Sequence, residues 1–258
     1  EDCAVPPEKL GDYLRDLDKL YDKYGYRGPF YGHFGQGLVH TRITFDLKTA
    51  DGIKAFRDFI AEATDLVASY GGVPSGEHGD GQSKAEFLDK IYGERLIEAF
   101  RAFKSIWDPE GKMNPGKVVE PHPVDSNLRL GSGFSPPTLE THFQYPDDGG
   151  SFAYATERCV GVGNCRKTEG GTMCPSYMAT REEQHSTRGR AHLLFEMLNF
   201  GPNRDGKGSP WKSDSVHEAL SLCLACKACK SECPVNVDMA TYKAEFYSHY
   251  YEGRLREP

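Results

Sequence analysis

The chain has 258 residues, enough for two domains, and its 38 acidic and 31 basic residues give a formal net charge of −7. This modest acidic balance argues against nucleic acid as the main partner. No apolar run approaches the roughly eighteen residues of a membrane-spanning helix. The first residues, Glu1-Asp2-Cys3, resemble neither a signal peptide nor an initiator methionine. We therefore expect a cytoplasmic piece of a longer polypeptide, and a peripheral position at the inner face of a membrane stays open.

The first 120 residues combine helical and alternating patterns. Apolar residues recur at helical spacing over residues 10–24, 53–70 and 94–107, and glycine follows the first two stretches. Residues 38–46 alternate instead, which predicts a strand with Val39 and Thr41 on one face and His40 and Arg42 on the other. The patterns together predict an α+β fold.

A segment rich in proline and glycine, residues 121–150, divides the chain and predicts a linker or an extended wrap. The remainder is helical and rich in loops, with helices expected over residues 187–199, 214–222 and 238–251. We expect a first domain over residues 1–122, a linker over 123–150 and a mainly α-helical second domain over 151–258.

The second domain contains a cysteine run that predicts an iron–sulfur site, Cys223-x2-Cys226-x2-Cys229-x3-Cys233-Pro234. In bacterial ferredoxins the first three cysteines of such a run bind one cluster and the fourth binds a second cluster. The alternative is a structural zinc site. Zinc modules usually separate their two cysteine pairs by a dozen or more residues, whereas these four cysteines lie within eleven, so the spacing favours iron.

A degenerate copy of this run precedes it. Cys159 and Cys165 match the first and third cysteines, Cys174-Pro175 matches the fourth, and Val162 takes the place of the second. Cys3 lies outside both runs, and we interpret it as an incidental thiol near a chain end.

Exchange of the fourth ligands between the two runs predicts two sites. One has four thiolates and suits a [4Fe–4S] cluster: Cys174, Cys223, Cys226 and Cys229. The other has Cys159, Cys165 and Cys233, and it suits a [3Fe–4S] cluster because Val162 cannot bind iron. The pattern resembles the iron–sulfur subunit of succinate dehydrogenase and fumarate reductase, in which an apolar residue at that place accompanies a three-iron cluster. A second [4Fe–4S] cluster completed by water, Asp or His stays open.

The first domain carries a second candidate site. His33-x6-His40 joins a glycine-rich turn to the expected strand, and Glu77-His78 lies in a glycine-rich loop. Two imidazoles and a carboxylate form a plausible set of ligands for a divalent metal. Arg42, expected on the same strand face as His40, could help to bind an anionic substrate, although a solvated arginine is an equal alternative.

Three motifs in this region resemble the C-terminal half of FAD-linked oxidases, the family of D-lactate, glycolate and D-2-hydroxyglutarate dehydrogenases. They are Tyr31-Gly32-His33-Phe34-Gly35-Gln36-Gly37-Leu38-Val39-His40, Ser75-Gly76-Glu77-His78-Gly79-Asp80-Gly81 and Trp107-Asp108-Pro109-Glu110-Gly111-Lys112-Met113-Asn114-Pro115-Gly116-Lys117. With the cysteine runs behind them, the chain resembles the middle of a bacterial fused flavin and iron–sulfur 2-hydroxyacid dehydrogenase. The resemblance implies part of a ferredoxin-like cap followed by a two-cluster ferredoxin-like domain.

The resemblance also implies roles for individual residues. His33, His40 and Glu77 would hold Zn²⁺ or Mn²⁺, and His78 would be the general base. Asn114 and Lys117 would lie near the flavin. The chain departs from the family at Gln36-Gly37-Leu38, where Asp-Gly-Asn is frequent, and at Arg42, where many relatives have asparagine. Arg42 could hold a second carboxylate, which favours a diacid such as 2-hydroxyglutarate.

No dinucleotide motif of the G-x-G-x-x-G type follows an expected strand, so we expect the FAD-binding domain to lie elsewhere in the same polypeptide or in a partner chain. The predicted function is oxidation of a D-2-hydroxyacid, 2-hydroxyglutarate or lactate, to the 2-oxoacid. Electrons would leave through the clusters to a quinone, a cytochrome or another flavoprotein. A non-catalytic electron-transfer subunit and a zinc-stapled interaction module are the alternatives.

Overall fold

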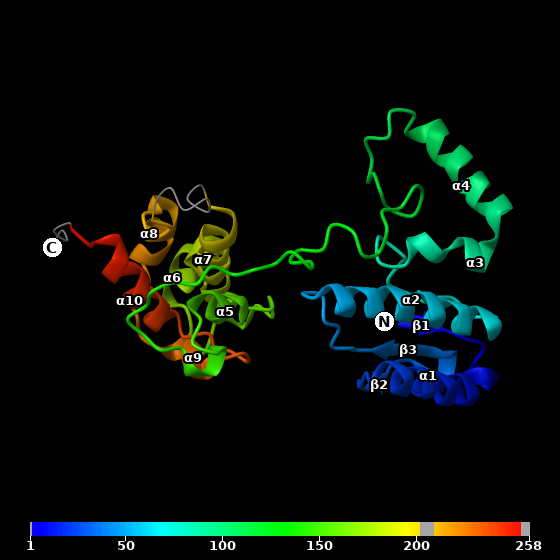
Figure 1. The fold of residues 1–258 in the computed structure, drawn as a ribbon, viewed down its shortest axis with the longest axis horizontal. Helices are drawn as coiled ribbons and strands as arrows, with labels where there is room; N and C mark the ends of the chain where they lie inside the picture. The colour runs from blue at the N-terminus through cyan, green and yellow to red at the C-terminus, as the bar shows by residue number, and fades with distance from the viewer. Residues whose placement is uncertain (1, 202–208, 254–258) are drawn as a thin grey trace. The chain divides into compact units, whose positions relative to one another are not determined.

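The computed structural model describes residues 2–201 and 209–253, and the chain forms two compact units, residues 1–134 and 135–258. The fold is α+β, with a small antiparallel sheet in the first unit and short helices throughout (Figure 1). Among the described residues, no helix combines the length and the apolar character needed to cross a membrane.

The sheet of the first unit has the strand order β1-β3-β2. Its strands are β1 (Asp2–Ala4), β2 (Phe30–Tyr31) and β3 (Leu38–Thr41). β3 is the central strand, with Val39 opposite Cys3 and His40 opposite Tyr31. The prediction of a strand over residues 38–46 is wrong beyond Thr41, because both neighbouring strands are short and offer no further backbone partners.

Two long helices cover this sheet, α1 (Leu10–Tyr24) and α2 (Ala50–Ser69). α1 ends at Gly25 in the left-handed conformation, and α2 begins at Thr49, whose side chain caps the amide of Gly52. Their apolar faces meet β3 in one core, which contains Tyr13, Leu17, Tyr21, Val39, Phe59 and Val67. The helices predicted over residues 10–24 and 53–70 are confirmed.

The first unit continues with α3 (Asp89–Tyr92) and α4 (Glu94–Trp107). α4 stands away from the sheet and its two helices in Figure 1, and none of its residues is buried. Phe103, Ile106 and Trp107 on this helix are more than half exposed. The helix predicted over residues 94–107 is confirmed, although its apolar side chains do not enter the core.

The second unit is helical. Its helices are α5 (Phe152–Glu157), α6 (Pro175–Thr180), α7 (Thr187–Phe200), α8 (Asp214–Ser221), α9 (Ala228–Glu232) and α10 (Met239–Tyr250). α7, α8 and α10 match the three helices predicted from periodicity. One core joins them, with Phe152, Leu194, Leu220, Met239 and Phe246 among its most buried members.

Single turns of 3-10 helix link these elements: Pro7–Lys9, Phe34–Gln36, Ala85–Phe87, Pro146–Asp148, Asn164–Arg166 and Glu183–His185. Part of the predicted linker also packs onto the second unit. The amides of His142 and Phe143 donate to the Glu245 carboxylate (2.9 Å each), and Tyr145 is buried in the core.

Candidate functional sites

The first candidate site joins β3 to two loops. His40 lies on β3, and His33 precedes the 3-10 turn that leads into that strand. Gly37 ends the turn with φ 75°, and a Cβ there would lie 1.9 Å from the carbonyl oxygen of Val5. Glycine is therefore required for this close approach, which shapes the turn between His33 and the strand that carries His40.

The structure brings His33, His40 and Glu77 together, with their ligand atoms all within 4.8 Å of one another. His40 Nε2 is 2.9 Å from one carboxylate oxygen of Glu77, and His33 Nε2 is 3.7 Å from the other. His78 lies beside them, its ring stacked on that of His40 at 4.9 Å and its Nε2 3.4 Å from Glu77. Two imidazole nitrogens therefore converge on one carboxylate, with a third imidazole alongside.

This donor set fits a divalent metal. Imidazole nitrogen and carboxylate oxygen are the ligands that catalytic zinc sites use, and three protein ligands leave positions open for substrate. His40 is buried and its Nδ1 has no hydrogen-bond partner among the described residues, while its Nε2 faces the other ligand atoms. The exposed side chains of His33 and His78 keep the site accessible.

Asp2 holds the loop that carries Glu77 and His78. Its buried carboxylate accepts hydrogen bonds from both of their amides (2.9 and 2.8 Å) and from the Ser75 hydroxyl (2.8 Å), and it pairs with Lys84. Burial by itself would raise the pKa of Asp2, but these hydrogen bonds hold it well below its usual value. The sequence analysis missed this residue because its partners lie more than seventy positions away.

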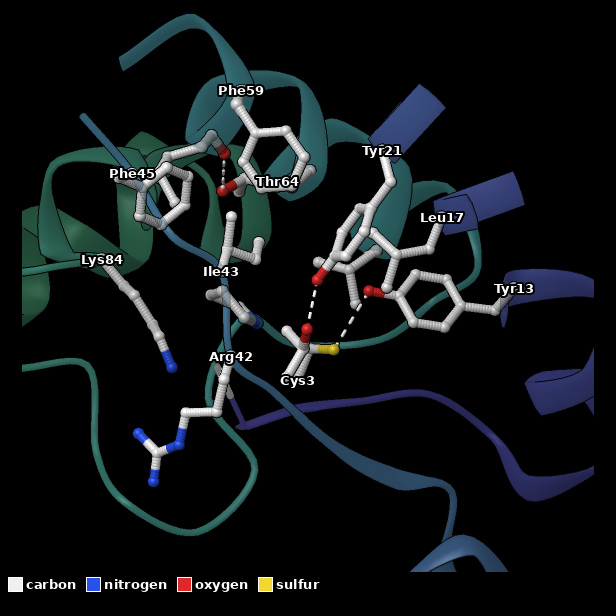
Figure 2. Close-up of a pocket in the computed structure, with 15 residues that line it drawn as sticks. Cys3, Tyr13, Leu17, Tyr21, Arg42, Ile43, Phe45, Phe59, Thr64 and Lys84 are labelled. Atoms are coloured by element: carbon white, nitrogen blue, oxygen red, sulfur yellow. Dashed lines mark hydrogen bonds between the residues drawn. The ribbon is translucent and has the colours of Figure 1, made fainter. Parts of the chain in front are cut away.

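Arg42 lies in a neighbouring pocket between the helices and the sheet. Figure 2 shows Arg42 and Lys84 on one side of this pocket, and Leu17, Tyr13 and Tyr21 of α1 on the other. The described lining includes neither His33, His40 nor Glu77. The strand ends at Thr41, so the expectation that Arg42 would share a strand face with His40 is wrong.

The two residues expected near a flavin lie after α4. Asn114 is exposed and adopts a left-handed conformation, φ 46°. Lys117 donates to the side chain of Gln82 (2.7 Å), in the loop that follows Glu77-His78. This hydrogen bond connects the turn that carries Lys117 to the loop that follows His78. It does not reach His33, His40 or Glu77.

The second candidate site consists of two cysteine-lined cavities in the second unit. One is lined by Cys174, Cys223, Cys226 and Cys229, and the other by Cys159, Cys165 and Cys233. They measure about 310 and 290 Å³, open solvent at their mouths included. All eight cysteines of the chain are free thiols, so no disulfide competes for them. These groupings are the ones that exchange of the fourth ligands predicts.

The two loops repeat each other in backbone conformation. Positive φ angles occur at Gly161 and Gly163 in the first loop (80° and 87°) and at Ala225 and Lys227 in the second (50° and 62°). In both loops the positive φ angles occur two and four residues after the first cysteine, Cys159 or Cys223. Val162 then takes the place of Cys226, and each lines its own cavity.

The first turn of α7 donates backbone hydrogen bonds to one cysteine of each cavity. The amide of Thr187 donates to Cys174 Sγ (3.0 Å), and the amide of Arg188 donates to Cys165 Sγ (3.3 Å). Hydrogen bonds with Cys174 and with the amide of Arg188 lower the pKa of Cys165, whereas the bond between the two thiols and burial raise the pKa of Cys174. Amides of this kind stabilise thiolate sulfur at a helix N-terminus.

Glu232, just before Cys233, fixes the segment just before Cys174. Its carboxylate accepts from the amide and hydroxyl of Thr172 (2.8 and 2.6 Å) and pairs with Lys167, and these bonds lower its pKa to about 2. The sequence analysis missed this residue because its partners lie about sixty positions away.

A third group, His142, Glu245 and His249, also has ligand atoms within 4.8 Å of one another. Its carboxylate is fully buried and accepts from two amides, the Tyr145 hydroxyl and the His249 ring. These donors satisfy the carboxylate without a metal, so we interpret the group as a structural network.

Comparison with known proteins identifies a domain family for each part of the chain. Residues 1–118 match the family model "FAD linked oxidases, C-terminal domain", and residues 155–237 match "4Fe-4S dicluster domain". The chain therefore joins the C-terminal domain of the FAD-linked oxidases to a 4Fe-4S dicluster domain, and the sequence-based family prediction is confirmed.

Among individual relatives, the whole chain is similar to D-2-hydroxyglutarate dehydrogenases. The identity is 30% with the Haemophilus influenzae enzyme and 33% with that of Pseudomonas putida, in each case over 100% of the chain. A D-lactate dehydrogenase from Archaeoglobus fulgidus is 38% identical over 46% of the chain and 26% of its own length. The chain spans 28% of the length of the two D-2-hydroxyglutarate dehydrogenases.

Proposed function

We propose that the chain is part of an oxidoreductase that oxidises a D-2-hydroxyacid, 2-hydroxyglutarate or lactate, to the 2-oxoacid and passes the electrons through iron–sulfur clusters. The observation that carries the proposal is the presence of both sites in one chain: a histidine–carboxylate cluster in the first unit and seven free thiols around two cavities in the second. The electron acceptor would be a quinone, a cytochrome or another flavoprotein.

The proposed chemistry requires a flavin, a divalent metal and two iron–sulfur clusters. When bound, these groups would supply a hydride acceptor, a Lewis acid for the substrate hydroxyl and one-electron transfer, respectively. We propose that His33, His40 and Glu77 hold Zn²⁺ or Mn²⁺, and that FAD binds mainly to a domain elsewhere in the same polypeptide or in a partner chain. Asn114 and Lys117 would contact the flavin. Cys174, Cys223, Cys226 and Cys229 would hold a [4Fe–4S] cluster, and Cys159, Cys165 and Cys233 a [3Fe–4S] cluster.

The residues of this chain would bind the substrate and move its proton. His78 Nε2 would accept the proton of the 2-hydroxyl group. Its ring is half exposed beside Glu77, and its backbone amide is fixed by Asp2. Arg42 would bind a second carboxylate at the neighbouring pocket, which it lines. This arrangement favours the diacid 2-hydroxyglutarate over lactate.

The domain organisation is part of the same proposal. We place part of a ferredoxin-like cap in residues 1–122, a connecting segment in 123–150 and a two-cluster ferredoxin-like domain in 151–258. The small antiparallel sheet with two helices and the repeated cysteine loops support this arrangement.

A substrate-driven reduction experiment tests the function. Anaerobic addition of D-2-hydroxyglutarate to the flavin-loaded complex should bleach the iron–sulfur absorbance, and Glu77→Gln should abolish this bleaching. Glu62→Gln is the matched control, because Glu62 bonds Lys23 and Tyr24 on the first unit's helices. Equal bleaching in the Glu77→Gln chain would contradict the catalytic role, and clusters without any bound divalent metal would indicate a purely electron-transferring subunit.

A further inference from the structure

Arg190 is a buried cation without a carboxylate partner in the described part of the chain. It is 2% exposed and lies in the first turn of α7, where the helix dipole disfavours a positive charge. Its Nε donates to the carbonyl oxygen of Ala219 (2.7 Å) and its second nitrogen donates to the hydroxyl of Ser176 (2.9 Å). Both acceptors are neutral. Burial of a charge is costly unless an opposite charge lies nearby, so a counter-charge is expected.

The groups that line the cavity beside Arg190 and can become negative are thiols. Arg190 lines the cavity of Cys174, Cys223, Cys226 and Cys229. No carboxylate lines this cavity in the described part of the chain. The lining groups that can supply the counter-charge are therefore the cysteine sulfurs, which are thiolates when they bind a cluster.

Arg188, two residues earlier, provides an internal comparison. It lines the three-cysteine cavity, but its Nε pairs with Glu183 at 2.7 Å and its side chain is 37% exposed. The carboxylate of Glu183 and the solvent therefore screen the charge of Arg188 from that cavity. One cavity thus has a neutralised arginine at its wall, and the other has an arginine whose charge only thiols can balance.

We propose that Arg190 is the resident counter-charge of the four-cysteine site and that it raises the reduction potential of the iron–sulfur cluster held there. This inference rests on the proposed iron–sulfur function. Reduction adds one electron, delivered from the hydroxyacid through the flavin, and no bond is formed or broken. The pocket then carries one more negative charge, so a fixed buried cation stabilises the reduced form more than the oxidised form. Because Arg190 acts on the cluster through its charge, we describe it as a positioning residue.

Redox titration of three iron-loaded full chains tests the proposal, with electron paramagnetic resonance used to follow each cluster. Arg190→Gln should reduce the equilibrium constant for reduction of the four-cysteine cluster at least tenfold, which is about 59 mV for one electron. Arg190→Lys keeps the charge and should change that constant less than tenfold. Arg188→Gln is the matched control, and it should leave the four-cysteine cluster unchanged.

Each outcome is decisive. A four-cysteine cluster with the same potential in the Arg190→Gln and wild-type chains would overturn the proposal and leave the iron–sulfur function intact. Absence of a cluster at this site in the wild-type chain would instead overturn the proposed function. If the glutamine variant does not fold, the lysine variant decides. A folded, iron-loaded lysine variant with a potential near that of the wild type supports the charge role, and one shifted tenfold or more overturns it.

Discussion

Val162 occupies, in the three-cysteine loop, the position that Cys226 occupies in the four-cysteine loop. The left-handed residues on either side coincide, with Gly161 matching Ala225 and Gly163 matching Lys227. Both residues line their cavities, and Val162 is 58% exposed. The two loops therefore present the same backbone to two cavities of similar size, and they differ in one ligand.

This relationship predicts that Val162→Cys adds one iron to the second unit. A thiolate at this position supplies the missing ligand, and the left-handed residues that shape the loop stay unchanged. Iron analysis of anaerobically purified protein should rise by one atom per chain, and the oxidised-state signal of a three-iron cluster should disappear. Val160→Cys, two residues before the repeated ligand position, is the control. Unchanged spectra in the Val162→Cys chain would count against the assignment.

Glu77→Gln should weaken binding of a divalent metal to the first unit by about 100-fold. The substitution replaces the carboxylate, whose two oxygens face His40 and His33, with a neutral amide, and metal ligands act as a set. Calorimetric titration of the iron-free chain with Zn²⁺ or Mn²⁺ measures the change, and Glu62→Gln should bind as the wild type does. Wild-type affinity in the Glu77→Gln chain would show that the metal binds elsewhere.

The lowered pKa of Asp2 predicts that the stability of the first unit depends on pH. Its pKa in the folded chain lies below the usual value near 3.9, so the carboxylate stabilises the fold above about pH 4, and this contribution is lost as the pH falls further. Asp2→Asn should destabilise the first unit by about 3 kcal/mol at pH 7, because Lys84 loses its buried partner.

Urea unfolding between pH 7 and pH 3, followed by the near-ultraviolet circular dichroism of the tyrosines in the first core, measures this effect. The difference between the Asp2→Asn and wild-type chains should shrink toward pH 3. Asp18→Asn, at an exposed position on α1, should match the wild type at each pH. A difference that stays constant with pH would mean that charge on Asp2 is not its cause.

Glu245→Gln should destabilise the second unit by about 1–3 kcal/mol. The amide nitrogen of glutamine would face N–H and O–H donors that now reach a buried carboxylate, so at least one of them would be left unpaired. Fluorescence of the buried Trp211 reports unfolding of this unit, and exposed Glu218→Gln should stay within about 0.5 kcal/mol of the wild type. Equal stability of the two variants would refute the structural role of Glu245.

Local sequence patterns predicted much of the fold and the grouping of the candidate ligand residues. Helix periodicity placed α1, α4 and α7 within one residue of their observed bounds, since each pattern depends only on nearby residues. The cysteine groupings followed from ligand spacing and from the rule that paired ferredoxin motifs exchange their fourth ligands.

Residues that act over long distances could not be predicted in this way. Asp2 bonds the amide of His78, 76 positions later, and Glu232 bonds Thr172, 60 positions earlier. Neither residue has a local signature, because its role arises only when the chain folds back on itself. The end of β3 at Thr41 has the same origin, since neighbouring strands set the length of a strand.

The central claim is that the seven cysteines of the two motifs hold iron in two groups that exchange their last ligands. Diffraction from crystals of the iron-loaded chain, recorded at the iron absorption edge, tests it most directly. We predict two separate iron centres, one bonded to Cys174, Cys223, Cys226 and Cys229 and the other to Cys159, Cys165 and Cys233. Zinc at either centre, a disulfide between the motifs, or Cys233 bonded to the same cluster as Cys223 would contradict the account.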